Sequence, residues 1–302
     1  MQYSGALIID KPQGFTSFDA VAVMRRLLGE RKIGHTGTLD PMATGVLVIL
    51  VGRATRAASF LEDTGKIYQA GFRFGEETDT QDSTGTVLHA SSLPVSRASL
   101  EAVMKRFRGE IFQLPPMYSA VSVNGQRLYA LARRGVTVER EKRPVTIASL
   151  ELCSYEEQTR EGVFQVSCSK GTYIRTLCAD IGEALGAYGV MTSLRRIRAC
   201  GFSLSDAVTL AEARTLAEAG RLADRILPTE ILFPEYRKAA VSAAQAVRFR
   251  NGGALDLGRI PALRGQPVPS GERIRVYGPD GGFLGLGACS PDTSELRILK
   301  LF

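Results

Sequence analysis

The stretch Gly34-His35-Thr36-Gly37-Thr38-Leu39-Asp40-Pro41-Met42-Ala43-Thr44-Gly45 runs directly into an apolar segment, Val46 to Val51. Glycines and turn-forming residues followed by a short apolar run predict an irregular loop that leads into a buried strand. Pro41 restricts the backbone directly after Asp40, and the three glycines allow backbone or ligand to approach closely. The stretch therefore predicts a rigid loop that holds one acid, Asp40, as a nucleophile, as a base, or as a structural turn residue.

The composition is that of an ordinary globular protein. The chain has 302 residues, a length that is enough for about two domains. Of these residues, 44% are hydrophobic and 23% are charged. No apolar run approaches the roughly 20 residues of a membrane span, and the N-terminus lacks the pattern of a secretory signal. We expect a cytoplasmic protein with no membrane association.

The sequence contains few cysteines and histidines that could bind a metal ion. The five cysteines form no CxxC pair, and the histidines are His35 and His89. A zinc site normally needs four such ligands at close spacing. We therefore expect buried, reduced thiols and no metal.

The net charge of +7 favours an acidic partner. Arginine outnumbers lysine, and its planar guanidinium binds phosphate through two hydrogen bonds and stacks on bases. Nucleic acid is one interpretation, and a solvated basic surface is the other.

The pattern of apolar residues predicts an α/β chain of the α+β type. One alternating run places Tyr68, Ala70, Phe72 and Phe74 on one face of a strand. One helical run places Phe18, Val21 and Leu28 on one face of a helix. We expect strands at 6–9, 46–51, 68–74 and 164–168, and helices at 16–28, 99–107, 126–134, 172–185 and 207–223. Beyond a boundary between Pro228 and Pro234, a hairpin at 274–286 and a strand at 296–301 predict a small β-rich module.

Arg175 indicates a partner for the acid. It falls in the first turn of its helix, where the helix dipole disfavours a cation by roughly 0.3–1 kcal/mol, and it is flanked by apolar residues. An inward arginine in that position requires a carboxylate or a bound anion. Asp40 is one candidate, and Asp180 or Glu183 is the structural alternative.

Other residues leave the chemistry open. Tyr68 and Tyr173 stand at the ends of predicted elements, where a ring can stack on a planar ligand or simply pack in the core. A phosphate-binding loop is disfavoured because no Gly-Lys-Ser/Thr follows the glycines. A glycosidase-like pair of carboxylates, Asp40 with Asp79 or Asp82, stays open as an alternative.

Five segments resemble the motifs of the TruB family of bacterial tRNA pseudouridine synthases, which act on uridine 55 of the T-loop. They are residues 5–17 (GALIIDKPQGFTS), 34–45 (GHTGTLDPMATG), 66–75 (KIYQAGFRFG), 115–120 (PPMYSA) and 170–177 (KGTYIRTL). The resemblance implies the pseudouridine-synthase fold: a mixed, mainly antiparallel sheet with flanking helices and a thumb insertion, plus a C-terminal PUA-like domain.

The resemblance also implies roles for single residues. Asp40 matches the catalytic aspartate, Arg175 the arginine that pairs with it, and Tyr68 the tyrosine that stacks on the target base and takes part in proton removal. Tyr173 and Leu194 match nucleotide-contacting positions, and His35 matches the histidine that supports the loop once the base is flipped out. No cofactor or metal is implied.

The resemblance further divides the chain into a catalytic domain, 1–235, and a PUA-like RNA-binding domain, 236–302. Residues 117–143 correspond to the thumb, whose Arg127, Arg133 and Arg134 we expect to contact tRNA phosphates. The implied partner is the T-arm of tRNA, with the acceptor stem touched by the C-terminal domain. We expect a monomer that needs no guide RNA, because the sequence lacks the basic terminal extensions of guide-dependent relatives. A tRNA-binding chaperone is the alternative function.

Overall fold

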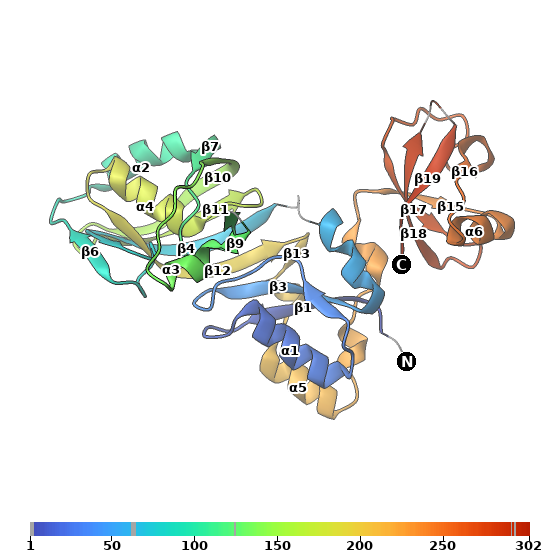
Figure 1. Cartoon of the computed structure of the whole chain (residues 1–302), viewed down its shortest axis with the longest axis horizontal. Helices are drawn as coiled ribbons and strands as arrows, with labels where there is room; N and C mark the ends of the chain where they lie inside the picture. The colour runs from blue at the N-terminus through green and yellow to red at the C-terminus, as the bar shows by residue number, and fades with distance from the viewer. Residues whose placement is uncertain (1–2, 62–64, 124, 291, 293) are drawn as a thin grey trace.

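A computed structural model describes residues 3–61, 65–123, 125–290, 292 and 294–302. It contains one large mixed sheet in the first three-quarters of the chain and a smaller sheet in the last quarter (Figure 1). The strands of the large sheet run in the order β14 (Val208–Thr209), β1 (Gly5–Lys11), β3 (Thr44–Val51), β12 (Gly189–Ala199), β4 (Lys66–Phe74), β11 (Glu161–Cys168), β10 (Arg143–Glu156) and β7 (Gly109–Gln113). Two short strands pair outside this path, β2 (Ile33–His35) with β3 and β13 (Phe202–Ser203) with β12. The sheet is mainly antiparallel, as expected.

The parallel pair β3–β12 joins the two halves of the large sheet. Arg195 lies opposite Thr44, and Arg196 lies opposite Gly45. Gly45 has a φ of 103°, and a Cβ atom there would lie 2.2 Å from the Arg196 carbonyl oxygen. The glycine freedom expected in the loop is therefore used at Gly45 by a neighbouring strand, which a side chain would displace.

The helices cover the sheet in two pairs. α1 (Ser17–Leu28) packs beside α5 (Leu210–Glu218) below the β1–β3 part of the sheet, and α2 (Arg97–Met104) packs beside α4 (Ile174–Ala184) near β10 and β12 (Figure 1). Both pairs contribute to one apolar core that includes Leu47, Phe72 and Leu177. No helix of the described residues is long and apolar enough to cross a membrane.

α1 begins where the sequence predicts, but its buried face is different. Thr16 caps the helix by accepting from the Asp19 N–H at 3.0 Å, which completes a capping box. Its buried residues are Ser17, Ala20, Val21 and Met24, whereas Phe18 is 70% exposed. The assignment of Phe18 to the inner face was wrong, because helical spacing fixes which residues share a face but not where the core face begins.

Two other helices are shorter than expected. The thumb helix, predicted at 126–134, is α3 (Leu128–Ala132), which buries Leu128 and Leu131 and follows a hairpin of β8 (Ser122–Val123) and β9 (Gln126–Arg127). Residue 124, within the predicted thumb, lies outside the described residues. The alanine-rich stretch 207–223 forms α5 over nine residues only. A second small hairpin joins β5 (Glu76–Thr78) and β6 (Val87–Ala90).

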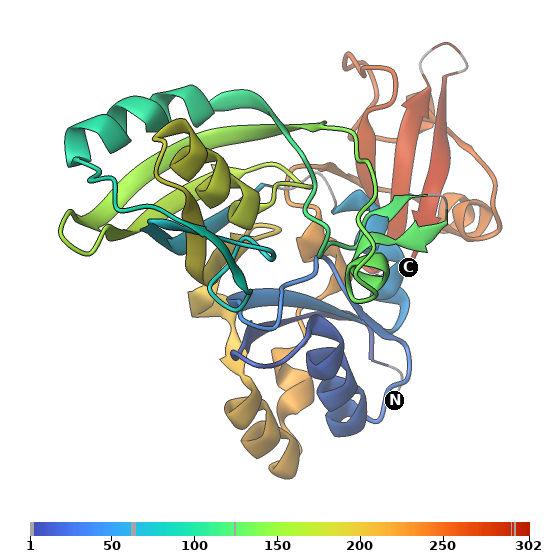
Figure 2. The ribbon, with the colours of Figure 1, turned by 60° about the vertical axis from the view of Figure 1, so that its left-hand side comes forward.

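The C-terminal sheet confirms the predicted hairpin and final strand. Its order is β15 (Arg237–Ala240), β17 (Arg273–Tyr277), β18 (Phe283–Ser290), β19 (Glu295–Leu301) and β16 (Leu255–Asp256), with α6 (Ala243–Arg250) packed against it. Among the described residues, no strand of this sheet pairs with a strand of the large one, and the 3-10 segment Gly52–Phe60 of the larger unit lies toward it (Figure 2).

Aromatic rings join the two parts of the chain. Phe233, only 2% exposed, lies 5.8 Å from the Phe302 ring and 6.1 Å from the Phe60 ring, measured between centroids. Leu286 of β18 belongs to the same apolar cluster as Ile8 and Val48 of the large sheet. The C-terminal sheet is therefore packed against the larger unit through a continuous apolar contact.

Four of the five cysteines are buried free thiols, as expected, whereas Cys153 is exposed.

Candidate active site

Four hydrogen bonds hold the loop that carries Asp40. The Leu39 N–H donates to Ser17 Oγ at 2.8 Å, and the Gly14 N–H donates to the Pro41 carbonyl at 2.8 Å. The Ala43 N–H closes a turn onto the Asp40 carbonyl at 3.0 Å, and Arg196 Nη2 donates to the Gly37 carbonyl at 3.1 Å. The predicted irregular loop leading into a buried strand is confirmed, and hydrogen bonds hold it on both sides of Asp40.

Arg175 is paired with Asp40, one of the candidates that the dipole argument left open. Its Nη2 lies 3.1 Å from Asp40 Oδ2 and also donates to the Tyr118 carbonyl at 3.0 Å. The arginine side chain is 7% exposed and that of Asp40 is 39% exposed. Among the described residues, the ion pairs of Arg175 go to Asp40 and Asp82, so Asp180 and Glu183 are not its partners.

Asp82 is a second acid at this guanidinium, whereas the sequence indicates it only as a candidate partner of Asp40 in a pair of carboxylates. Its Oδ2 lies 3.6 Å from Arg175 Nη1, while its Oδ1 accepts from the hydroxyls of Thr80 and Thr84 at 2.9 and 2.6 Å. The Asp82 side chain is 6% exposed. Because its oxygens are hydrogen-bonded and buried, Asp82 is placed to orient Arg175.

Tyr68 and Leu194 lie on neighbouring strands on the same face of the sheet. Both are 8% exposed and belong to the main apolar core. Burial raises the pKa of the Tyr68 phenol, while the nearby Arg196 charge opposes that rise. The negative charge of the Asp40 carboxylate adds to the rise, because it disfavours ionisation of the phenol.

Tyr173 lies at the N-cap position of α4, directly before Ile174 and Arg175. The buried Gln113 of β7 holds its backbone on both sides, accepting from the Tyr173 N–H at 2.9 Å and donating to its carbonyl at 3.2 Å. This amide clamp fixes the start of α4 and hence the direction in which Arg175 leaves the helix.

His35 stands at the other end of the loop, five residues before Asp40. The Gly37 N–H donates to His35 Nδ1 at 3.3 Å, so the proton of the neutral ring sits on Nε2. Burial, assisted by the Arg196 charge, lowers the pKa of His35. The imidazole is therefore neutral at pH 7.

Two buried cations complete the surroundings, and neither was predicted as a site residue. Arg196 is 1% exposed and donates from Nε to the Val46 carbonyl at 2.7 Å. Lys11 is fully buried, donates to the carbonyls of Pro12 and Phe15, and has its pKa lowered by burial to about 8, with Asp40 opposing the change.

The different burial of Arg196 and Arg198 follows from the register of β12. The pairing of β12 with β4 shifts between Arg196 and Arg198, and such an irregularity moves the following residue off the regular alternation of faces. Arg196 is accordingly buried while Arg198, two residues later, is exposed. The sequence shows only a run of arginines here and does not reveal the shift.

The thumb arginines lie away from these groups. Arg127, Arg133 and Arg134 are all exposed. Arg127 donates to the Ala120 carbonyl, and the Arg133 guanidinium lies 5.6 Å from the centre of the Tyr129 ring. In the described part of this segment, the Tyr118 carbonyl reaches the site and accepts from Arg175.

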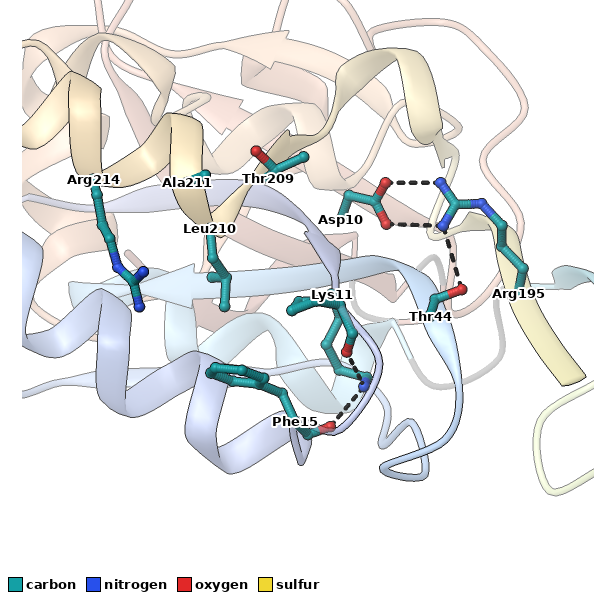
Figure 3. A pocket seen from close by; sticks show the side chains of 10 residues that line it. Asp10, Lys11, Phe15, Thr44, Arg195, Thr209, Leu210, Ala211 and Arg214 are labelled. Atoms are coloured by element: carbon teal, nitrogen blue, oxygen red, sulfur yellow. Dashed lines mark hydrogen bonds and ion pairs between the residues drawn. The ribbon is translucent and has the colours of Figure 1, made fainter. Parts of the chain in front are cut away.

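A pocket of about 360 Å³ opens between the end of β1 and the start of α5 (Figure 3). Asp10 and Arg195 form a two-bond ion pair on one side, with Oδ2–Nη2 and Oδ1–Nη1 distances of 2.7 and 3.2 Å, and Arg214 reaches in from the other side. Asp40, Tyr68 and Arg175 are not among its lining residues.

The sequence comparisons agree with this geometry. Residues 25–174 match the TruB family pseudouridylate synthase N-terminal domain, and residues 175–233 match the tRNA pseudouridylate synthase B C-terminal domain. The chain is 44% identical over 292 residues to the tRNA pseudouridine synthase B of Pseudomonas fluorescens, covering 96% of this chain and 92% of that protein. It is 40% identical over 299 residues to the enzyme of that name from Alkaliphilus oremlandii, covering 99% and 97%.

Solved structures give the same answer for the fold. A Cbf5–Nop10–Gar1 complex matches with a TM-score of 0.74 and 26% identity, covering 98% of this chain and 84% of that one. An H/ACA RNP bound to a substrate RNA that contains 2'-deoxyuridine matches with a TM-score of 0.75 and 25% identity, covering 99% and 84%. The chain therefore belongs to the TruB family of pseudouridylate synthases.

Proposed function

We propose that this chain is a tRNA pseudouridine synthase that isomerises uridine 55 in the T-loop of tRNA, without metal, cofactor or guide RNA. The relatives named tRNA pseudouridine synthase B support the reaction and the substrate class. The observation that carries the proposal is the half-exposed Asp40 carboxylate. The buried Arg175 lies 3.1 Å from it, and four hydrogen bonds hold its loop.

In this mechanism Asp40 is the nucleophile. Its carboxylate attacks the target nucleoside, at the base or at the ribose, and the bond between C1′ and N1 breaks. The freed uracil rotates and rejoins C1′ through C5. The bond between Asp40 and the nucleoside then breaks and frees the carboxylate, C5 loses its proton, and N1 gains one. Substrate and product contain the same atoms, so the reaction needs no further reactant. Arg175 holds the carboxylate in position because its guanidinium is itself fixed by Asp82.

Tyr68 supports the base during this rearrangement. Its ring stacks on the uracil, and its hydroxyl takes part in removing the C5 proton. Because its pKa is raised, the phenol is neutral at pH 7, so it relays the proton rather than acting as a phenolate.

The target base must leave the T-loop stack to reach Asp40, at a cost of a few kcal/mol. We assign His35 to the space that the base leaves, and Tyr173 and Leu194 to contacts with the flipped nucleotide. The thumb, 117–143, closes over the T-loop and contributes Arg127, Arg133 and Arg134 to its phosphates. Residues 236–302 form a PUA-like domain that contacts the acceptor stem, and the protein acts as a monomer.

Tritium release from carbon-5-labelled uridine in a T-arm hairpin tests the proposal. We expect wild-type protein to release tritium and Asp40→Asn to release none, while hairpin affinity stays within a few-fold. Asp224→Asn, which neutralises an acid on the exposed surface, is the matched control and should keep full activity. Appreciable turnover by Asp40→Asn would refute the role of Asp40. Tight binding by wild-type protein with no tritium release would instead support the tRNA-binding chaperone.

A further inference from the structure

An exposed aromatic ring stands beside the loop of Asp40 and has no role in the mechanism above. Phe18, in the first turn of α1, is 70% exposed. Most of the ring stays in water, so the fold leaves unused most of the free energy of burying it. A single exposed phenylalanine is common on protein surfaces, so it is the contacts of this ring that point to a ligand.

The ring has a defined position. Phe18 meets the His35 ring edge to face, with 5.5 Å between centroids and 85° between planes. The neighbouring Ser17 Oγ accepts from the Leu39 N–H and donates to the Leu39 carbonyl at 3.3 Å, so the first turn of α1 is bonded to the residue before Asp40. A ring contact and the hydrogen bonds of its neighbour Ser17 therefore link Phe18 to the loop of Asp40.

The chemistry of this pair selects a flat, uncharged partner. His35 is neutral, because its Nδ1 accepts a hydrogen bond and burial lowers its pKa. The Phe18 ring is exposed and stands at right angles to the His35 ring, which carries a single N–H donor. Single-stranded nucleic acids are bound by such rings because every base has a face that can stack.

The distance along the chain limits which base this is. Five residues separate His35 from Asp40, at most about 18 Å at full extension. A base that meets Phe18 must therefore belong to the nucleotides close to the target in the same loop.

We propose that Phe18 is a stacking position for a second, unpaired base of the T-loop, next to the target uridine. This inference rests on the proposed function. It adds a binding residue on α1 to the site, and it explains why an exposed ring is held rigidly against the loop of the nucleophile.

The test measures tritium release by Phe18 variants on the T-arm hairpin. Base stacking on an aromatic ring is worth enough to change kcat/KM by about 5- to 150-fold. We expect Phe18→Ala and Phe18→Leu to show such a loss, mainly through KM, and Phe18→Tyr to stay close to wild type. Leu88→Ala, which truncates a 54% exposed apolar side chain on β6, is the control and should change nothing.

A second measurement separates stacking from a structural effect. Hairpins that lack one base at a time, with an abasic sugar at each unpaired loop position, are assayed with wild-type protein and with Phe18→Ala. At one position the loss caused by the substitution should disappear, because the base that stacks on Phe18 is already gone. A Phe18→Ala rate within twofold of wild type, or an equal loss on every abasic hairpin, would overturn the proposal. The proposed function is judged separately, by turnover of the intact hairpin with wild-type protein.

Discussion

Replacing Arg175 by lysine tests how the guanidinium serves Asp40. The two terminal nitrogens of Arg175 make four contacts. Nη2 lies 3.1 Å from the Asp40 carboxylate and donates to the Tyr118 carbonyl. Nη1 lies 3.6 Å from the Asp82 carboxylate and donates to the Thr80 carbonyl. A single ammonium group cannot reach both sides. Lysine still places a charge near the buried Asp82, which avoids the about 3–5 kcal/mol cost of an unpaired buried ion.

The expected loss follows from the contact to Asp40. A hydrogen bond to a charged group contributes about 1.5–3 kcal/mol. Losing one such bond and one carbonyl contact would cost up to about 4 kcal/mol. Because the Asp40 side chain is 39% exposed, water screens the pair, and we take about 2–3 kcal/mol. This corresponds to a fall of about 30- to 160-fold in the rate of the chemical step.

Single-turnover tritium release at saturating protein measures that step without the binding equilibrium. We expect the rate to fall by this factor while the affinity for the hairpin is unchanged. Arg195→Lys is the matched control, since Arg195 also binds a carboxylate through two bonds, to Asp10 in the pocket of Figure 3. It should lose less than threefold. A rate for Arg175→Lys above a third of wild type would refute the argument that the two-sided guanidinium positions Asp40.

Two further predictions concern stability. The pKa of Lys11 is lowered from 10.5 to about 8. Between these two pH values the lysine of the unfolded chain holds a proton that the lysine of the folded chain lacks. The free energy of unfolding should therefore rise with pH over this range, by up to about 3 kcal/mol. Urea unfolding at pH 7.5 and pH 10 should show this rise in wild type relative to Lys11→Met, and equal slopes in the two proteins would contradict it. Phe233→Ala should cost about 3–5 kcal/mol, because the 2% exposed ring packs against Phe60 and Phe302 between the two parts of the chain. Thermal unfolding that matches wild type would show that these contacts carry little free energy.

Much of the fold could be predicted because local patterns and tertiary structure agree. The alternation from Tyr68 to Phe74 matches β4, the cap at Thr16 matches the start of α1, and the turn before Phe283 matches the C-terminal hairpin. In each case one face is buried or one turn is closed by neighbours in sequence, so a local window contains the information.

The candidate site could be predicted in part. A cation in the first turn of a helix is unfavourable by itself, which is why the sequence alone links Arg175 to an acid. Asp82 could not be assigned in the same way, because its turn is polar in sequence and becomes buried only when it packs beside Met191. Phe18 was placed on the wrong face because the core face of α1 is set by α5 and β2, which are distant in sequence or too short to recognise.

The pairing of β3 with β12 has a consequence for the order in which the protein is made. The loop of Asp40 takes its form from residues 150 positions later, since Arg196 binds the Val46 carbonyl and lies against Gly45. On a ribosome that adds about 5–20 residues per second, Asp40 emerges roughly 8–30 s before these partners exist. A nascent chain that ends before β12 therefore carries Asp40 without the strand that supports its loop. The loop can be completed only after two-thirds of the protein has been synthesised.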